Sequence, residues 1–355
     1  MSGRVEVGPV TAERGSRAFG TLPIAISGNG GEIGIGVHIL AGAKPGPKVV
    51  VMSGSHGYEL NPIATSKRLV EEIDPATVTG DLIIIPLQNP IAFEMGARGT
   101  WIDGVWGDSG NMNRLWPGRR NGWLTERFTH AISTHALPGA TVLIDLHGPT
   151  TDLQLSYGYL GSGSPGELDY DLNRVFGQEM LVWNSPEALK EKNQATTTSK
   201  ASARLAGVCA ISCELGDFYG LQQDRSSGGP ALHRYGPEIG FTGVTNVMKH
   251  LGMLEGELVK PRRQISVTPE LNLRPNHGGL MITHVGIEDL GTVVPKGTPL
   301  GTLVSASSFA VLDEITAPFD ESLLIATQFH QPFTKVHPGE FNYIVADNKL
   351  TEEVP

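Results

Sequence analysis

The chain has 355 residues, of which 39% are hydrophobic and 18% charged, the composition of an ordinary globular protein with room for a sizeable core. Its 37 acidic residues outnumber 27 basic ones, and the formal net charge of −10 argues against general affinity for nucleic acid or an anionic membrane surface. Since no stretch approaches the roughly 18 apolar residues that cross a bilayer, we expect a cytoplasmic protein.

The N-terminal part of the chain predicts a β-hairpin followed by a parallel crossover. An apolar segment at 22–27 and an alternating one at 33–39 flank a glycine-rich turn, which is typical of two paired strands. A buried strand at 49–52, a helix at 62–72 and a second strand at 82–86 then follow in the order that produces two parallel strands.

The middle of the chain continues the α/β pattern. A helix is expected around 123–135, a third apolar strand at 141–146 and a fourth at 208–213. The glycine- and tryptophan-rich section 96–122 is too irregular for regular elements and too long for a simple connector, so we expect it to line a site.

From about residue 274 onward, closely spaced turns and short strands predict an all-β domain. Its plausible display hairpin, 305–309, contains no lysine to which a lipoyl or biotinyl group could be attached. We therefore interpret the tail as a structural or assembly module.

Residues His56 and Glu59 lie on a glycine-flanked turn directly after the strand at 49–52. Sheets of α/β proteins place their chemistry at such strand ends. The spacing His-x-x-Glu lets an imidazole nitrogen and a carboxylate oxygen converge on one ion, a pairing that zinc accepts. The plainer interpretation is a turn histidine beside a surface glutamate, and the motif alone does not decide between the two.

Two further strand ends carry ionisable side chains. His147 ends the third strand and is the natural third ligand, which would leave a fourth zinc position to water. Asp145, two residues earlier, either orients an imidazole or makes a structural hydrogen bond. Glu214 ends the fourth strand and is the best candidate for a general base, although it could instead cap a turn or pair with an arginine.

Two Asn-Arg pairs compete for the role of substrate anchor. The first is Asn113-Arg114, with Arg98 upstream, and the second is Asn173-Arg174. In either pair the amide and the planar guanidinium could together hold a carboxylate.

The motifs follow one another in a recognisable order: GSHGYE at 54–59, Asn-Pro at 89–90 with Arg98, Asn-Arg at 113–114 with Pro-Gly at 117–118, DLH at 145–147 and ELG at 214–216, followed by the β-rich tail. This series resembles the succinylglutamate desuccinylase/aspartoacylase family, which is related to the zinc carboxypeptidases. The resemblance extends from about residue 24 to the end of the chain. Two positions depart from the usual family pattern, namely Tyr58 within the first motif and Asn111, where the family favours aspartate.

The resemblance implies a set of site residues. By motif position, His56, Glu59 and His147 bind Zn²⁺, and Glu214 acts on the water beside the metal. Arg114, Arg98 and Asn113 face the substrate carboxylate or the polarised carbonyl. The pair at 113–114 is preferred over 173–174 because in the family the arginine motif lies between the second and third zinc ligands and is followed by Pro-Gly.

The resemblance also implies an α/β fold, with a mixed sheet flanked by helices as in zinc carboxypeptidases and a small barrel-like all-β domain appended. We expect a zinc-hydrolase catalytic domain at 1–270 and the all-β domain at 271–355.

The expected activity is that of a zinc-dependent amidohydrolase that deacylates a small N-acyl amino acid or related carboxylated amide. The alternatives are a zinc carboxypeptidase acting on peptide C-termini and a non-catalytic, metal-stabilised binding protein. The expected partner is a small molecule with a carboxylate, without nucleic acid or membrane, and homo-oligomerisation is left open.

Overall fold

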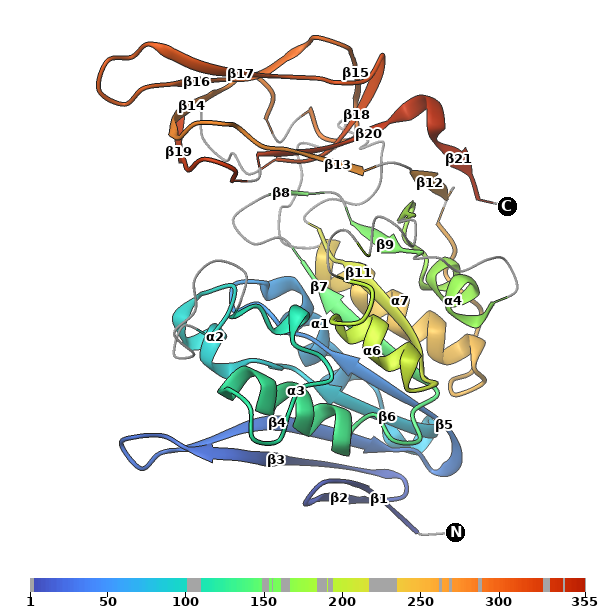
Figure 1. The fold of residues 1–355 in the computed structure, drawn as a ribbon. Coiled ribbons are helices and arrows are strands. Elements are labelled where there is room, and N and C mark those ends of the chain that lie inside the picture. The colour runs from blue at the N-terminus through green and yellow to red at the C-terminus, as the bar shows by residue number, and fades with distance from the viewer. Residues whose placement is uncertain are drawn as a thin grey trace.

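A computed structural model describes residues 3–100, 110–148, 153–154, 156–160, 167–183, 190, 194–216, 235–261, 264–267, 270–286, 289–327, 333–340 and 342–354. Figure 1 shows a large sheet with helices in the lower part of the molecule and smaller β-sheets, formed mainly by the C-terminal part of the chain, above it. This arrangement confirms the mixed α/β fold with additional all-β sheets at the C-terminus.

Within the described part of the chain, the large sheet has ten strands. In spatial order they are β21 (Glu352–Glu353), β12 (Ile265–Val267), β10 (Met180–Val182), β9 (Tyr157–Tyr159), β11 (Cys209–Glu214), β7 (Val142–His147), β5 (Lys44–Met52), β6 (Thr79–Ile85), β4 (Glu32–Ala41) and β3 (Ser16–Ile26). Strands β11, β7, β5 and β6 are mutually parallel, as the crossover pattern predicts, and β3 and β4 form the expected antiparallel hairpin.

Helices cover both faces of this sheet. They are α1 (Leu60–Glu72), α2 (Pro90–Met95), α3 (Leu124–His135), α4 (Leu168–Phe176), α6 (Ser199–Leu205) and α7 (Tyr235–His250), with short 3-10 turns η1 (Pro75–Thr77), η4 (Met112–Arg114) and η7 (Asn348–Leu350). The predicted helices at 62–72 and 123–135 correspond to α1 and α3.

Side-chain alternation along β7 assigns each face its helices. Leu143 packs with Phe128 of α3 and Ala203 of α6, whereas Ile144 packs with Leu69 of α1 and Val244 of α7. Successive residues of a strand point to opposite faces, so Asp145 and His147 lie on the same face as Leu143.

The C-terminal strands form two smaller sheets, and a separate N-terminal hairpin lies at the other end of the molecule (Figure 1). One sheet contains β13 (Glu270–Leu273), β20 (Tyr343–Asp347), β18 (Glu321–Thr327) and β15 (Val293–Pro295), with β8 (Leu153–Gln154) paired to β18. The other sheet contains β17 (Val311–Thr316), β16 (Pro299–Val304), β14 (Gly279–Thr283) and β19 (Phe333–Val336). The N-terminal hairpin is formed by β1 (Arg4–Val7) and β2 (Val10–Glu13).

Two connections join these sheets to the large one. Strand β8 belongs to the segment after β7 yet pairs with β18, and β21 returns from the C-terminal part to pair with β12. One apolar cluster also contains Tyr157 and Val267 of the large sheet together with Leu323 and Tyr343 of the smaller one. The division into domains at residue 270 stays a prediction.

Among the described residues, none of the helices is long and apolar enough to cross a membrane. The cytoplasmic location expected from the sequence stays a prediction.

Candidate active site

The carboxyl ends of β5, β7 and β11 meet at one edge of the sheet and carry the predicted site residues. Met52 of β5 is in register with Asp145 of β7, and His147 of β7 is in register with Glu214 of β11. Parallel neighbours lie about 4.8 Å apart, so these strand ends deliver His147 and Glu214 side by side.

The turn that follows β5 depends on Gly57. A Cβ atom at this position would lie 1.9 Å from the carbonyl oxygen of Ala92 in α2, so only glycine lets the turn pack against that helix. The backbone N–H of Gly57 also donates to the carbonyl of Ala97 at 2.8 Å. This bond brings the segment carrying Arg98, which is exposed, next to the turn between His56 and Glu59.

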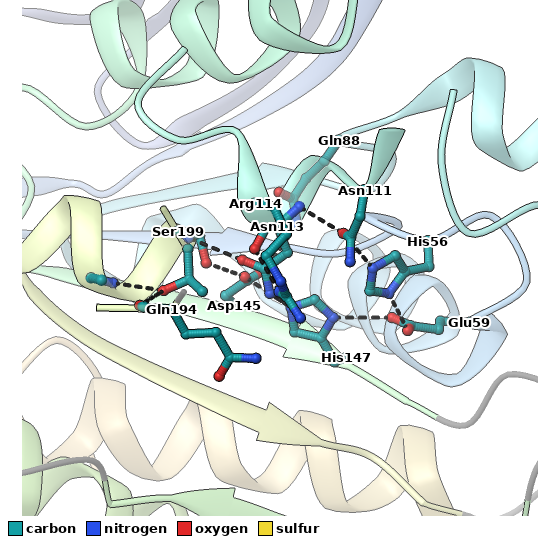
Figure 2. Close-up of polar contacts among 12 residues, drawn as sticks. His56, Glu59, Gln88, Asn111, Asn113, Arg114, Asp145, His147, Gln194 and Ser199 are labelled. Carbon is teal, nitrogen blue, oxygen red and sulfur yellow. Dashed lines mark hydrogen bonds and ion pairs between the residues drawn. The ribbon is translucent and has the colours of Figure 1, made fainter. Parts of the chain in front are cut away.

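At this edge of the sheet the buried side chains of three residues converge, namely His56, Glu59 and His147 (Figure 2). One ligand atom from each lies within 4.8 Å of the others, and the three side chains are 2–4% exposed. The Nδ1 atom of His56 lies 2.5 Å from Glu59 Oε1, and the Nδ1 atom of His147 lies 3.2 Å from Glu59 Oε2. Two imidazoles and a carboxylate from three separate positions form a donor set that suits zinc.

The outer nitrogen of each imidazole faces an oxygen acceptor. Nε2 of His56 lies 2.9 Å from Asn111 Oδ1, and Nε2 of His147 lies 3.0 Å from Asp145 Oδ2. Each imidazole thus has its Nδ1 atom toward the Glu59 carboxylate and its Nε2 atom toward a second residue that fixes the orientation of the ring. The residues present therefore fit a metal ion held by two Nδ1 atoms and the Glu59 carboxylate.

The charges of this cluster shift its pKa values strongly. Burial opposes ionisation of Glu59, but the neighbouring His56 and His147 outweigh it and lower the pKa of Glu59 to about 2. Burial likewise opposes a charge on His147, whereas Asp145 and Glu59 raise the pKa of its imidazole well above the usual value. The pKa of Asp145 is lowered despite its burial, chiefly by His147, so Asp145 is an ionised acceptor.

Asp145 is itself held on both oxygens. Gln88 donates from Nε2 to Oδ1 at 2.9 Å, and Ser199 donates from Oγ to Oδ2. The backbone N–H of Ser199 in turn donates to Asn113 Oδ1 at 3.0 Å, and Asn113 Nδ2 lies 3.3 Å from His147 Nε2 (Figure 2). Ser199, at the start of α6, therefore connects the cluster of possible metal ligands to the predicted substrate anchor.

Sequence reasoning missed three of these contributors. Gln88 lies three residues after the end of β6, and this position near a strand end could have indicated that it belongs to the site. Asn111 was noted only as a departure from a family pattern, and Ser199 lies in a segment that carries no motif.

The structure places the first Asn-Arg pair at the cluster. Asn113 contacts His147, and Arg114 donates from a guanidinium nitrogen to the carbonyl of Asn113 at 2.7 Å. Asn173 of the competing pair is buried in α4, where its amide donates to the carbonyl of Asp169 at 2.7 Å. Residues 101–109 of the section expected to line the site lie outside the described residues.

Glu214 lies on the same face of the sheet as His147. Cys213 of β11 packs in the apolar cluster that also contains Ile144, and Ala210 packs in the opposite one. By alternation, Glu214 points away from Cys213 and toward the face that carries His147.

Replacing Asp145 by asparagine tests the outer contact of His147. The variant keeps the side-chain shape but removes the negative charge opposite Nε2, so we expect the affinity for zinc to fall by about 10- to 100-fold. Competition with a chromophoric chelator measures this affinity. Asp81→Asn is the matched control, because Asp81 pairs with Arg14 near the start of β6. Equal zinc affinity in Asp145→Asn and the wild type would contradict the proposed contact.

Comparisons with known proteins identify relatives of this chain. A curated relative, N-alpha-acetyl-L-2,4-diaminobutyric acid deacetylase of Halomonas elongata, is 26% identical over 219 residues, which cover 61% of this chain and 58% of that protein. The product-bound structure of the ectoine utilization protein EutE from Ruegeria pomeroyi has a TM-score of 0.76 at 21% identity and covers 98% of this chain and 100% of its own.

A crystal structure of a succinylglutamate desuccinylase from Silicibacter sp. TM1040 has a TM-score of 0.75 at 21% identity, with 97% of this chain and 99% of that chain covered. At these identities the solved structures establish the fold. The family model of the Succinylglutamate desuccinylase/Aspartoacylase catalytic domain matches residues 45–232, a range that contains every predicted site residue. The resemblance seen in the sequence is thereby confirmed, and the chain belongs to the succinylglutamate desuccinylase/aspartoacylase family.

Proposed function

We propose that the protein is a zinc-dependent amidohydrolase that removes the acyl group from a small N-acyl amino acid or related carboxylated amide. The observation that carries the proposal is the buried convergence of His56, Glu59 and His147 beside Glu214 at the strand edge. The family supports hydrolysis of such amides, and the curated relative is named for the deacetylation of an acetylated diamino acid.

His56 and His147, each through Nδ1, and Glu59 through its carboxylate would hold the ion. A zinc ion held there supplies Lewis-acid polarisation of a carbonyl and activation of water. The protein's own contribution is to orient both imidazoles, through the contacts of their Nε2 atoms with Asn111 and Asp145.

Glu214 is proposed as the general base and acid. A carboxylate on the face of His147 can take a proton from the attacking water and then deliver it to the leaving nitrogen. Its place at the end of β11, in register with His147, supports this role.

Arg114, Arg98 and Asn113 are proposed to bind the substrate. The guanidinium of Arg114, anchored to the backbone of Asn113, would stabilise the negative charge that develops on the carbonyl oxygen. Arg98, on the segment beside the His56 turn, and the amide of Asn113 would orient the substrate carboxylate.

We further propose that residues 1–270 form a catalytic unit with a zinc carboxypeptidase-like sheet and that 271–355 form a barrel-like unit shaping the entrance to the site. The pairing of β8 with β18 supports this, because β8 follows His147 closely in the chain.

Glu214→Gln is expected to retain zinc while turnover falls by about 10²- to 10⁴-fold, because the amide cannot accept the proton. Zinc content and hydrolysis rate are measured on the same preparation. Glu72→Gln, which alters an exposed carboxylate on α1 paired with Arg68, serves as the control. Unchanged hydrolysis in Glu214→Gln would remove Glu214 from the mechanism.

A substrate panel separates deacylation from peptide cleavage. We expect N-acetyl and N-succinyl amino acids, including N-acetyl-2,4-diaminobutyrate, to be hydrolysed with higher kcat/KM than unblocked dipeptides and tripeptides. The released amine is quantified by mass spectrometry. A preference for peptides would favour a carboxypeptidase, and zinc binding without hydrolysis of any amide would favour a binding protein.

A further inference from the structure

Besides its ladder pairing with β7 and β9, the backbone at Glu214 and Leu215 makes three hydrogen bonds to other described parts of the chain. The N–H of Leu215 donates to the carbonyl of His147 at 2.7 Å. The carbonyl of Leu215 accepts from Asn61 Nδ2 at 3.0 Å, and the carbonyl of Glu214 accepts from Gln178 Nε2 at 2.9 Å. Two of the three donors are side chains, so each of these two hydrogen bonds can be removed by a single substitution.

Asn61 belongs to the first turn of α1, and Glu59 is the N-cap residue of the same helix. One short segment therefore supplies both a proposed metal ligand and a hydrogen bond to the residue that follows Glu214. Because the N–H of Leu215 also bonds the carbonyl of His147, the residue after Glu214 is bonded to one proposed ligand residue and to the helix that begins at another.

The amide of Asn61 is confined by the start of α7. A Cβ atom at Gly236 would lie 2.5 Å from Asn61 Nδ2 and 2.6 Å from its Cγ, so the helix packs directly on the amide. This contact limits the conformations of the side chain that point at Leu215. A methyl group at residue 236 would push the amide away without changing its chemistry.

Gln178 is a buried residue in the segment between α4 and β10, 2% exposed. The backbone carbonyl of Gln178 accepts a hydrogen bond from Gln264 Nε2 at 2.9 Å, so a second side-chain amide holds the backbone of Gln178. The carbonyl of Glu214 is thus bound by the segment between α4 and β10, which contributes none of the proposed metal ligands.

We propose that Asn61 is a positioning residue that sets the distance between the Glu214 carboxylate and the metal ligands, with Gln178 holding the other peptide group of the same strand end. The inference rests on the proposed role of Glu214 as base. Proton transfer requires the base within hydrogen-bond reach of its partner, and a displacement of about 1 Å can cost on the order of 100-fold in rate.

The first experiment measures kcat, KM and zinc affinity of Asn61→Ala. We expect kcat to fall by about 10- to 100-fold, with zinc affinity and KM within about twofold of the wild type. Asn61→Asp, which keeps the shape but removes the donor, should behave alike and replaces the alanine variant if that does not fold. Gly236→Ala should reproduce the loss from the other side of the contact.

Asn246→Ala is the matched control. The amide of Asn246 also binds backbone groups, donating to the carbonyl of Val259 at 2.8 Å and accepting from its N–H at 2.9 Å, but it lies in the C-terminal third of α7. This variant should lower the melting temperature and leave kcat unchanged.

The decisive measurement combines Asn61→Ala with Glu214→Gln. If Asn61 acts through the Glu214 carboxylate, it has no further effect on the residual rate once that carboxylate is gone, although the melting temperature still falls. Equal losses in both backgrounds, or a normal kcat in Asn61→Ala, would overturn the positioning role. A normal rate in Glu214→Gln alone would instead overturn the proposed function, so the two failures are distinguishable.

Discussion

The site depends on a buried carboxylate that lies between two imidazoles. Glu59 is 2% exposed, and an ionised carboxylate is stable in such a place only when opposite charge or strong donors compensate for its lost hydration. His56 and His147 provide that compensation, and a divalent cation between them would provide more. The turn at Gly57 and the parallel strands β5 and β7 serve to bring these three side chains together.

The groups behind the imidazoles differ in charge. His56 faces the neutral amide of Asn111, whereas His147 faces the ionised Asp145, which Gln88 and Ser199 hold in place (Figure 2). Glu59 and Asp145 together carry two negative charges, which match a divalent ion bound by two neutral histidines. Asn111 therefore provides an acceptor for His56 without adding a third buried negative charge.

The sequence was sufficient where local patterns determine structure. Apolar runs ending at His56, His147 and Glu214 are consistent with parallel strands, and strands of that kind end at a common edge, so the convergence of their ends followed from pattern alone. It was insufficient where contacts join distant segments. Ser199 and Asn61 act through hydrogen bonds to residues far along the chain, and neither lies in a pattern that reveals its partner.

The C-terminal part shows the same limit. Its turns and short strands predicted all-β structure. The strands β8 and β21, which connect it to the large sheet, have only two residues each, so no alternation of apolar and polar residues could predict them. These connections explain how a β-rich tail can lie close to strands that carry the site.

The central claim, that Glu59 anchors a metal ion between two histidines, is tested most directly by metal stoichiometry. Purified protein reconstituted with zinc and then desalted is analysed by inductively coupled plasma mass spectrometry, alongside Glu59→Gln. We expect about one zinc ion per wild-type chain, for a site with three protein ligands, and a marked loss in the variant. Equal zinc content in both proteins, or none in the wild type, would contradict the claim.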